Sequence, residues 1–261
     1  MKDRELCPYL RTRTGRRPLI ALHGLGGSSA QPMGLLDPEV LEKFDVIAPD
    51  LRAHGSNRMP VDDSHLTFAG MAADVRDLIE ALDLSEPPVI MGISMGAGIA
   101  LELQSTSEQY AALLLVRPAW AWESHSANLD VFLLIAHLMD EYQPAEARAR
   151  FSASSEYAQI AEVSPAAAQA LLPQFDAPLA VERRLRLRAL PADHPRRPTA
   201  PVPGIVLGSN ADPVHPIHIA QRVATDTSME FDFAPPRYDE PEAHRAAISS
   251  ALLRVGEGDI R

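Results

Sequence analysis

Short apolar runs alternate with helical patterns along most of this chain, and that alternation limits the folds open to it. Six runs have the length of strands and lie at 18–22, 45–48, 88–91, 111–116, 204–207 and 228–233. The first five are mostly continuous, as in strands buried on both faces of a parallel sheet. Helical patterns lie at 67–82, 95–103 and 240–255. This order predicts an α/β fold, with a mostly parallel central sheet flanked by helices.

The alternation stops between Pro118 and Val202, where short helices joined by proline-rich turns are expected. We therefore predict a core domain made of residues 1–118 and 202–261, with a helical cap or lid inserted at 119–201. The insertion follows a strand, which places it over the C-terminal ends of the strands. Open α/β sheets bind their ligands at that edge.

Composition excludes some functions and favours a location. The 261 residues carry a formal charge of −11, so the chain lacks the excess of lysine and arginine that nucleic-acid binding needs. The single cysteine, Cys7, cannot form an intrachain disulfide, which suits a reducing compartment. No secretory signal and no membrane-length apolar run are evident. We expect a cytoplasmic protein that binds neither membrane nor nucleic acid. The sequence is silent on its oligomeric state.

One pentapeptide predicts the reaction chemistry. Gly92-Ile93-Ser94-Met95-Gly96 follows the apolar run 88–91 directly and opens the helical pattern at 95–103. A Gly-x-Ser-x-Gly sequence between a strand and a helix is typical of a nucleophile elbow, in which a strained turn holds the serine hydroxyl clear of the backbone. Ser94 is therefore the predicted nucleophile.

Further segments resemble the α/β-hydrolase family from about residue 18 to residue 255. His23-Gly24-Leu25-Gly26 follows the first apolar run and resembles the family's His-Gly loop, and 48–56 resembles its Asp-x-Arg-Gly-His-Gly segment with Ala53 in place of a glycine. The resemblance implies an oxyanion hole formed by the backbone N–H groups of Leu25 and Met95.

The resemblance also implies the acid and the base, in the family order serine, acid, histidine. Residues 208–216 resemble the family's Gly-x-x-Asp-x-x-x-Pro turn, which makes Asp212 the acid. His244 follows the last strand and opens the last helical pattern, so it is the expected base. His215 and His218 are expected to pack in the turn and the following helix. With Asp212 they have only a weak metal-ligand spacing, and we predict no metal site.

These residues together predict a serine hydrolase that forms an acyl-enzyme on Ser94 and needs no cofactor. A serine nucleophile argues against the haloalkane dehalogenases and epoxide hydrolases of this fold, which use aspartate. A small or medium ester, thioester, lactone or C–C substrate remains open. A non-hydrolysing ligand-binding protein and an acyltransferase on the same fold are the alternatives. Trp120 and Trp122 are the expected substrate-binding residues, because they leave the sheet nearest to Ser94.

Overall fold

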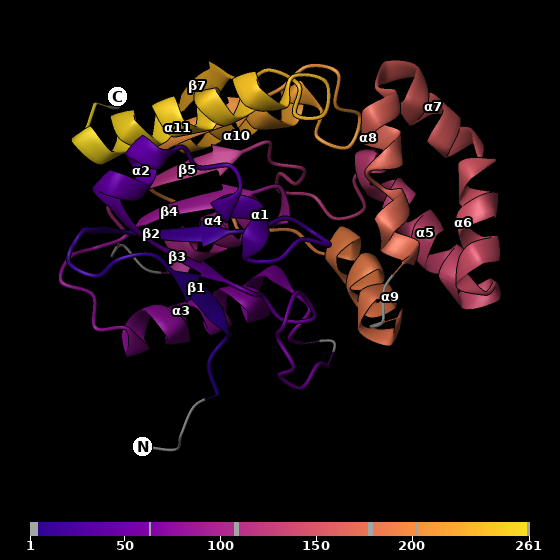
Figure 1. Cartoon of the computed structure of the whole chain (residues 1–261), viewed down its shortest axis with the longest axis horizontal. Helices are drawn as coiled ribbons and strands as arrows, with labels where there is room; N and C mark the ends of the chain where they lie inside the picture. The colour runs from indigo at the N-terminus through magenta and orange to yellow at the C-terminus, as the bar shows by residue number, and fades with distance from the viewer. Residues whose placement is uncertain (1–4, 63, 107–109, 177–179, 202, 260–261) are drawn as a thin grey trace.

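A seven-stranded sheet forms the centre of the computed structural model, which describes residues 5–62, 64–106, 110–176, 180–201 and 203–259 (Figure 1). The strands are β1 (Tyr9–Arg11), β2 (Arg17–Leu22), β3 (Phe44–Pro49), β4 (Val89–Ile93), β5 (Ala112–Val116), β6 (Gly204–Gly208) and β7 (Glu230–Phe233). They are arranged in the order β1-β3-β2-β4-β5-β6-β7. The β1–β3 pair is antiparallel and every other pair is parallel. The predicted fold class is confirmed.

Strand β1 has no counterpart among the predicted strands. It has three residues, and two of them are exposed: Tyr9 at 40 % and Leu10 at 48 %. A short edge strand of this kind carries no continuous apolar run, so the pattern that identifies buried strands does not detect it.

Alternate residues of the strands face two separate apolar layers. Ile20 and Leu22 of β2 pack in one layer, and Leu19 and Ala21 pack in the other. The first layer is completed by α3 (Phe68–Ala81), α4 (Met95–Thr106) and α10 (Ile217–Thr227). The second is completed by α2 (Pro38–Lys43) and α11 (Pro241–Glu257). The short helix α1 (Ala30–Met33) precedes α2. Helices on both faces explain why β2 to β5 read as continuous apolar runs.

The chain between β5 and β6 is helical, as the sequence predicts. It contains α5 (Asp130–Glu141), α6 (Pro144–Ser152), α7 (Ser155–Val163), α8 (Pro165–Gln169) and α9 (Ala180–Ala189), with the 3-10 turns η1 (Ala127–Leu129), η2 (Leu172–Phe175) and η3 (Leu190–Ala192). These helices gather on one side of the sheet (Figure 1). The division into a core and a cap at 119–201 remains a prediction.

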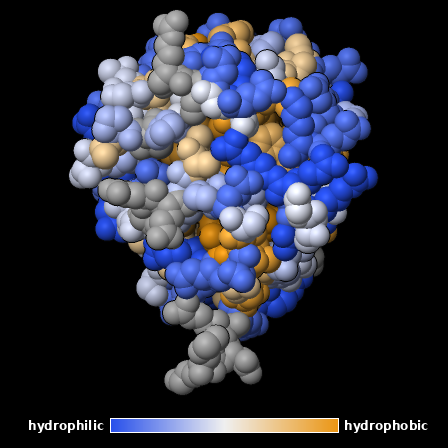
Figure 2. All heavy atoms as spheres, turned by 90° about the vertical axis from the view of Figure 1, so that its left-hand side faces the viewer, coloured by the Kyte–Doolittle hydropathy of each residue, from blue (hydrophilic) through white to orange (hydrophobic). Residues whose placement is uncertain are grey.

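The opposite side of the molecule is mostly hydrophilic, and hydrophobic side chains show there only in small areas (Figure 2). None of the helices among the described residues combines the length and hydrophobicity that crossing a bilayer requires.

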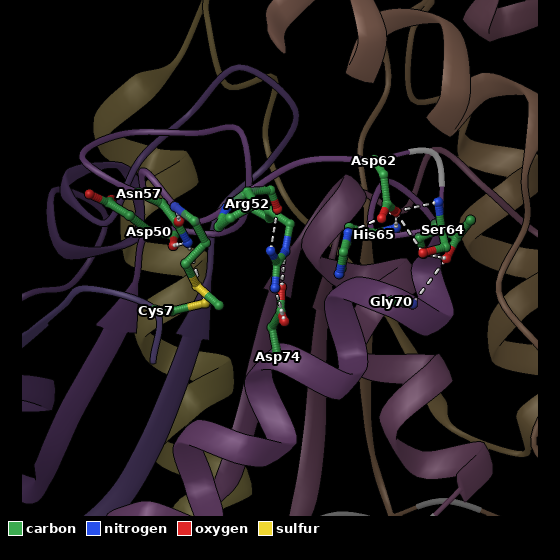
Figure 3. Close-up of polar contacts among 12 residues, drawn as sticks. Cys7, Asp50, Arg52, Asn57, Asp62, Ser64, His65, Gly70 and Asp74 are labelled. Carbon is green, nitrogen blue, oxygen red and sulfur yellow. Dashed lines mark hydrogen bonds and ion pairs between the residues drawn. The ribbon is translucent and has the colours of Figure 1, made fainter. Parts of the chain in front are cut away.

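Polar side chains anchor the segment that follows β3. Arg52 and Asp74 point toward one another and form an ion pair at 2.6 Å, and the amide of Asn57 donates to the Cys7 sulfur at 3.4 Å (Figure 3). Burial, reinforced by the charge of Asp74, raises the pKa of the Cys7 thiol to about 12. These contacts tie the segment after β3 to α3 through Asp74 and to the N-terminal part of the chain through Cys7.

Candidate active site

The turn between β4 and α4 holds Ser94 in a strained conformation. Its φ is 54°, in the left-handed region that residues with a side chain rarely adopt. A Cβ atom at Gly92 would lie 2.2 Å from the Gly96 carbonyl oxygen, and one at Gly96 would lie 2.5 Å from the carbonyl oxygen of Leu22. Strand and helix therefore approach as closely as a nucleophile elbow requires, and only glycine fits at either position.

Ser94 Oγ lies in hydrogen-bond contact with a histidine, and that histidine is His215. The distance from His215 Nε2 to Ser94 Oγ is 2.8 Å. The other ring nitrogen, Nδ1, lies 2.9 Å from Asp212 Oδ1. The contacts form a continuous line from a hydroxyl through an imidazole to a carboxylate, which is the geometry of a catalytic triad.

A short turn after β6 brings the acid and the base together. His215 follows Asp212 by three residues, and its backbone N–H also donates to Asp212 Oδ1 at 3.2 Å. The second carboxylate oxygen, Oδ2, accepts from Arg117 Nη1. Arg117 stands directly after β5 with a φ of 47° and is 2 % exposed. The carboxylate of Asp212 is thus held by His215 at Oδ1 and by Arg117 at Oδ2.

The charges around Asp212 and His215 favour an ionised acid and a neutral base. Burial by itself would raise the pKa of Asp212, but His215 and Arg117 hold that pKa well below its usual range. Burial lowers the pKa of His215; the Asp212 charge opposes this shift and the Arg117 charge adds to it. A neutral His215 bonded to an ionised Asp212 carries its proton on Nδ1, which leaves the Nε2 lone pair facing Ser94.

The structure does not bring His244 to Ser94, which corrects the expected base. His244 lies in the first turn of α11 and is fully buried. Its Nδ1 lies 2.6 Å from the Pro235 carbonyl oxygen, and its Nε2 has no hydrogen-bond partner in the described part of the chain. Burial and the nearby Arg117 charge lower the pKa of His244 to about 4. The position matches the family order along the chain, but the ring is bonded to the loop that precedes α11 and not to Ser94.

The two residues whose backbone N–H groups are expected to bind an oxyanion, Leu25 and Met95, lie close to Ser94. Met95 follows Ser94 in the chain, and Leu25 borders the same cavity as Ser94. A Cβ atom at Gly24 would lie 3.4 Å from the Ser94 Cβ, so the His-Gly loop passes directly beside the nucleophile. Gln31 fixes this loop by accepting the Gly24 N–H at 2.7 Å. The arrangement suits the stabilisation of negative charge on a substrate oxygen.

A small cavity of about 70 Å³ opens at Ser94. Its apolar walls include Phe132 from α5, Ala167 from α8, and Leu171 and Val214. The inserted helices therefore contribute directly to the pocket.

Neither tryptophan expected in the pocket lines it. Trp120 is buried, donates its indole N–H to the Leu190 carbonyl oxygen at 3.1 Å and packs edge-on against Phe68. Trp122 donates to Asp226 at 2.8 Å. The pocket is lined by Phe132 and by neither tryptophan, because the Trp120 indole turns to Leu190 and the Trp122 indole turns to Asp226 on α10.

The described residues contain no group of three or more histidine, cysteine, aspartate or glutamate side chains placed to hold a metal ion. His218 is exposed on α10 and stands apart from the Asp212–His215 contact.

A family model described as "alpha/beta hydrolase fold" matches residues 17–198, and the chain belongs to this α/β-hydrolase family. An uncharacterized protein of Mycobacterium tuberculosis is 36 % identical over 84 residues, which are 32 % of this chain and 24 % of that protein. Human protein phosphatase methylesterase 1 is 33 % identical over 93 residues, 34 % of this chain and 24 % of that protein. The matched part of the chain spans about a quarter of the length of these curated relatives.

Two solved structures share the fold over nearly the whole chain. A putative non-heme bromoperoxidase from Mycobacterium tuberculosis has a TM-score of 0.69 at 21 % identity and covers 98 % of this chain and 99 % of its own. A thermophilic esterase from Thermogutta terrifontis has a TM-score of 0.66 at 20 % identity and covers 95 % of this chain and 93 % of its own. Membership of the family, with esterases among the proteins of this fold, supports a hydrolase.

Proposed function

We propose that the chain is a serine hydrolase in which Ser94, His215 and Asp212 form the catalytic triad. The observation that carries the proposal is the line of contacts from Ser94 Oγ to His215 Nε2 at 2.8 Å and from His215 Nδ1 to Asp212 Oδ1 at 2.9 Å. A serine hydroxyl is a weak nucleophile at neutral pH and becomes reactive when a neutral imidazole accepts its proton.

The reaction proceeds through an acyl-enzyme. His215 Nε2 accepts the proton of Ser94 as Oγ attacks the substrate carbonyl carbon, and the N–H groups of Leu25 and Met95 hold the resulting oxyanion. His215 then gives the proton to the leaving group. Water attacks the acyl-enzyme by the same route and releases the acid. Asp212 stays ionised throughout and stabilises the transient imidazolium.

The proposed substrate is a small or medium ester, thioester, lactone or C–C compound. The cavity volume of about 70 Å³ supports a small acyl group at Ser94. In this proposal the helices of 119–201 act as a cap, because α5 and α8 supply Phe132 and Ala167 to the pocket walls. A closed cap excludes water from the site during acylation.

Labelling with a fluorophosphonate probe tests the proposal. We expect intact-mass spectrometry to show a single adduct, which disappears in Ser94→Ala and persists in Ser152→Ala, a control serine on α6. A p-nitrophenyl acetate assay on the same proteins separates a hydrolase from a ligand-binding protein, and added alcohol acceptors reveal an acyltransferase. Labelling that survives Ser94→Ala would overturn the assignment of the nucleophile.

A further inference from the structure

An arginine with no hydrogen-bond or ion-pair partner among the described residues borders the cavity at Ser94. Arg237 lies in the loop between β7 and α11 and lines the same cavity as Ser94 and His215. Among the described residues its guanidinium has no hydrogen bond and no ion pair; it lies 5.2 Å from the centroid of the Tyr238 ring. The side chain is partly buried, and a guanidinium beside a cavity can bind a carboxylate through two parallel N–H···O hydrogen bonds.

Three other arginines that are not fully exposed do have an anionic partner. Arg11 pairs with Asp45 at 2.6 Å, Arg52 pairs with Asp74 at 2.6 Å, and Arg254 pairs with Glu230 at 2.5 Å. Arg237 differs from these three because its side chain borders a cavity instead of a carboxylate.

The charges that line the cavity do not balance. Two guanidinium groups, those of Arg117 and Arg237, face one carboxylate, that of Asp212. Asp212 already bonds to Arg117 and to His215. The chain as a whole carries a formal charge of −11, so the excess positive charge at this cavity is a local feature. An anion bound in the cavity would neutralise it.

The loop that carries Arg237 is held in place from the inserted helices. Asp239 accepts the Ser164 hydroxyl at 2.9 Å, and Ser164 is the residue that caps α8. The loop runs beside α8 where the core meets the inserted helices (Figure 1). The nearest acidic side chain along this loop is thus turned to α8, and the Arg237 guanidinium stays available to a ligand.

We propose that the substrate carries a carboxylate and that Arg237 binds it. This inference rests on the proposed function of Ser94 and specifies its substrate. Phe132, Leu171 and Val214 give the cavity apolar walls that suit a short aliphatic chain. The substrate class is therefore an ester of a short dicarboxylic acid with one carboxyl group free.

The chemistry balances without further reactants. Ser94 Oγ bonds to the ester carbonyl carbon, and the alcohol leaves with the proton carried by His215. Water then cleaves the acyl-enzyme and releases the dicarboxylic acid. Arg237 stays paired with the free carboxylate and transfers no proton.

Two esters of equal length test the role of Arg237 by turnover. The probes are monoethyl glutarate, which carries a carboxylate, and ethyl 4-carbamoylbutanoate, which carries a neutral amide in its place. We expect the wild-type kcat/KM to be about 10- to 100-fold higher for the acid ester, as for hydrogen bonds to charged groups. Arg237→Gln brings this ratio close to 1. The control Arg222→Gln removes an exposed arginine paired with Glu123 and keeps the wild-type ratio. A wild-type ratio near 1, or an unchanged ratio in Arg237→Gln, would overturn the inference.

A binding measurement on inactive protein separates this inference from the proposed function. Calorimetric titration of Ser94→Ala with monoethyl glutarate should show binding that weakens at least about 10-fold when Arg237→Gln is added. If this difference is found but wild-type protein turns over neither ester, the carboxylate site stands and the proposed function fails. If wild-type protein hydrolyses both esters equally, the proposed function stands and the role of Arg237 fails.

Discussion

At the scale of single residues, the two oxygens of Asp212 organise the site. Oδ1 lies 2.9 Å from the His215 ring, and Oδ2 accepts from the buried Arg117. Because Arg117 favours the ionised carboxylate, Asp212 can accept a hydrogen bond from the Nδ1–H group of His215 without itself becoming protonated. The orientation of the base therefore depends on a residue that does not contact Ser94 itself.

The pH dependence of the reaction follows from the environment of His215. Burial lowers the pKa of this histidine from its ordinary value of 6.5, the Asp212 charge opposes the shift, and the Arg117 charge adds to it. The base acts only when neutral, so activity is retained above its pKa and lost as pH falls through it. We expect kcat/KM for a neutral ester to rise with pH, with a midpoint below 6.5, and to be flat above pH 7. An activity midpoint above pH 7 in the pH–rate profile would contradict this account.

The sequence predicts Ser94 but not its contact with His215, and the reason is physical. The elbow is local, since five consecutive residues between a strand and a helix define it. The contact between Ser94 and His215 joins residues 121 positions apart and depends on how the turn after β6 folds back. The position of His215, three residues after Asp212, is the sequence feature that could have pointed to this contact. The family order favoured His244, whose ring is instead bonded to the Pro235 carbonyl.

At the scale of elements, the close approach of β4 and α4 exposes the nucleophile. Gly92→Ala places a methyl group where the Gly96 carbonyl oxygen already lies, at 2.2 Å from the new Cβ. Backbone cannot move aside as a side chain can, so we expect a loss of at least about 1–3 kcal/mol in the free energy of unfolding and a loss of fluorophosphonate labelling.

Gly34→Ala is the matched control for this substitution. A Cβ at Gly34 meets its nearest atom at 3.4 Å, an ordinary contact, and its φ of −73° suits alanine. Urea unfolding should show little change for this variant. Equal destabilisation of the two variants would mean that the elbow does not depend on close packing at Gly92.

The strands and helices were more predictable than the side chains of the inserted region. Apolar runs identify β2 to β6 because both faces of these strands are covered. Trp120 and Trp122 were assigned from their distance along the chain after β5, but chain position does not determine the direction of an indole. Trp120 turns to the Leu190 carbonyl and Trp122 to Asp226.

At the scale of the whole molecule, segments far apart in the chain line one small cavity. The elbow supplies Ser94, the turn after β6 supplies His215, and the inserted helices supply Phe132 and Ala167. The loop before α11 adds Arg237. In the proposed function, the walls of this cavity would select the substrate that reaches Ser94.

The proposed cap of residues 119–201 predicts a limit on the length of the acyl chain. We expect kcat/KM for p-nitrophenyl esters, measured from acetate to palmitate, to peak at short chains and to fall steeply by about C8–C10, because a closed pocket rejects what it cannot contain. A peak at C12 or longer would mean that the inserted helices leave an open groove, and the role of 119–201 as a cap would be wrong.

The central claim is that His215 is the base, and replacing each histidine separately tests it most directly. Steady-state kcat/KM for a neutral p-nitrophenyl ester is measured for His215→Ala and His244→Ala, with circular dichroism to establish that both variants are folded. We predict a loss of about 10³–10⁴-fold for His215→Ala, as for triad members, and a change of less than about 10-fold for folded His244→Ala. The opposite result, an active His215→Ala and a folded His244→Ala that has lost about 10³-fold, would contradict the account.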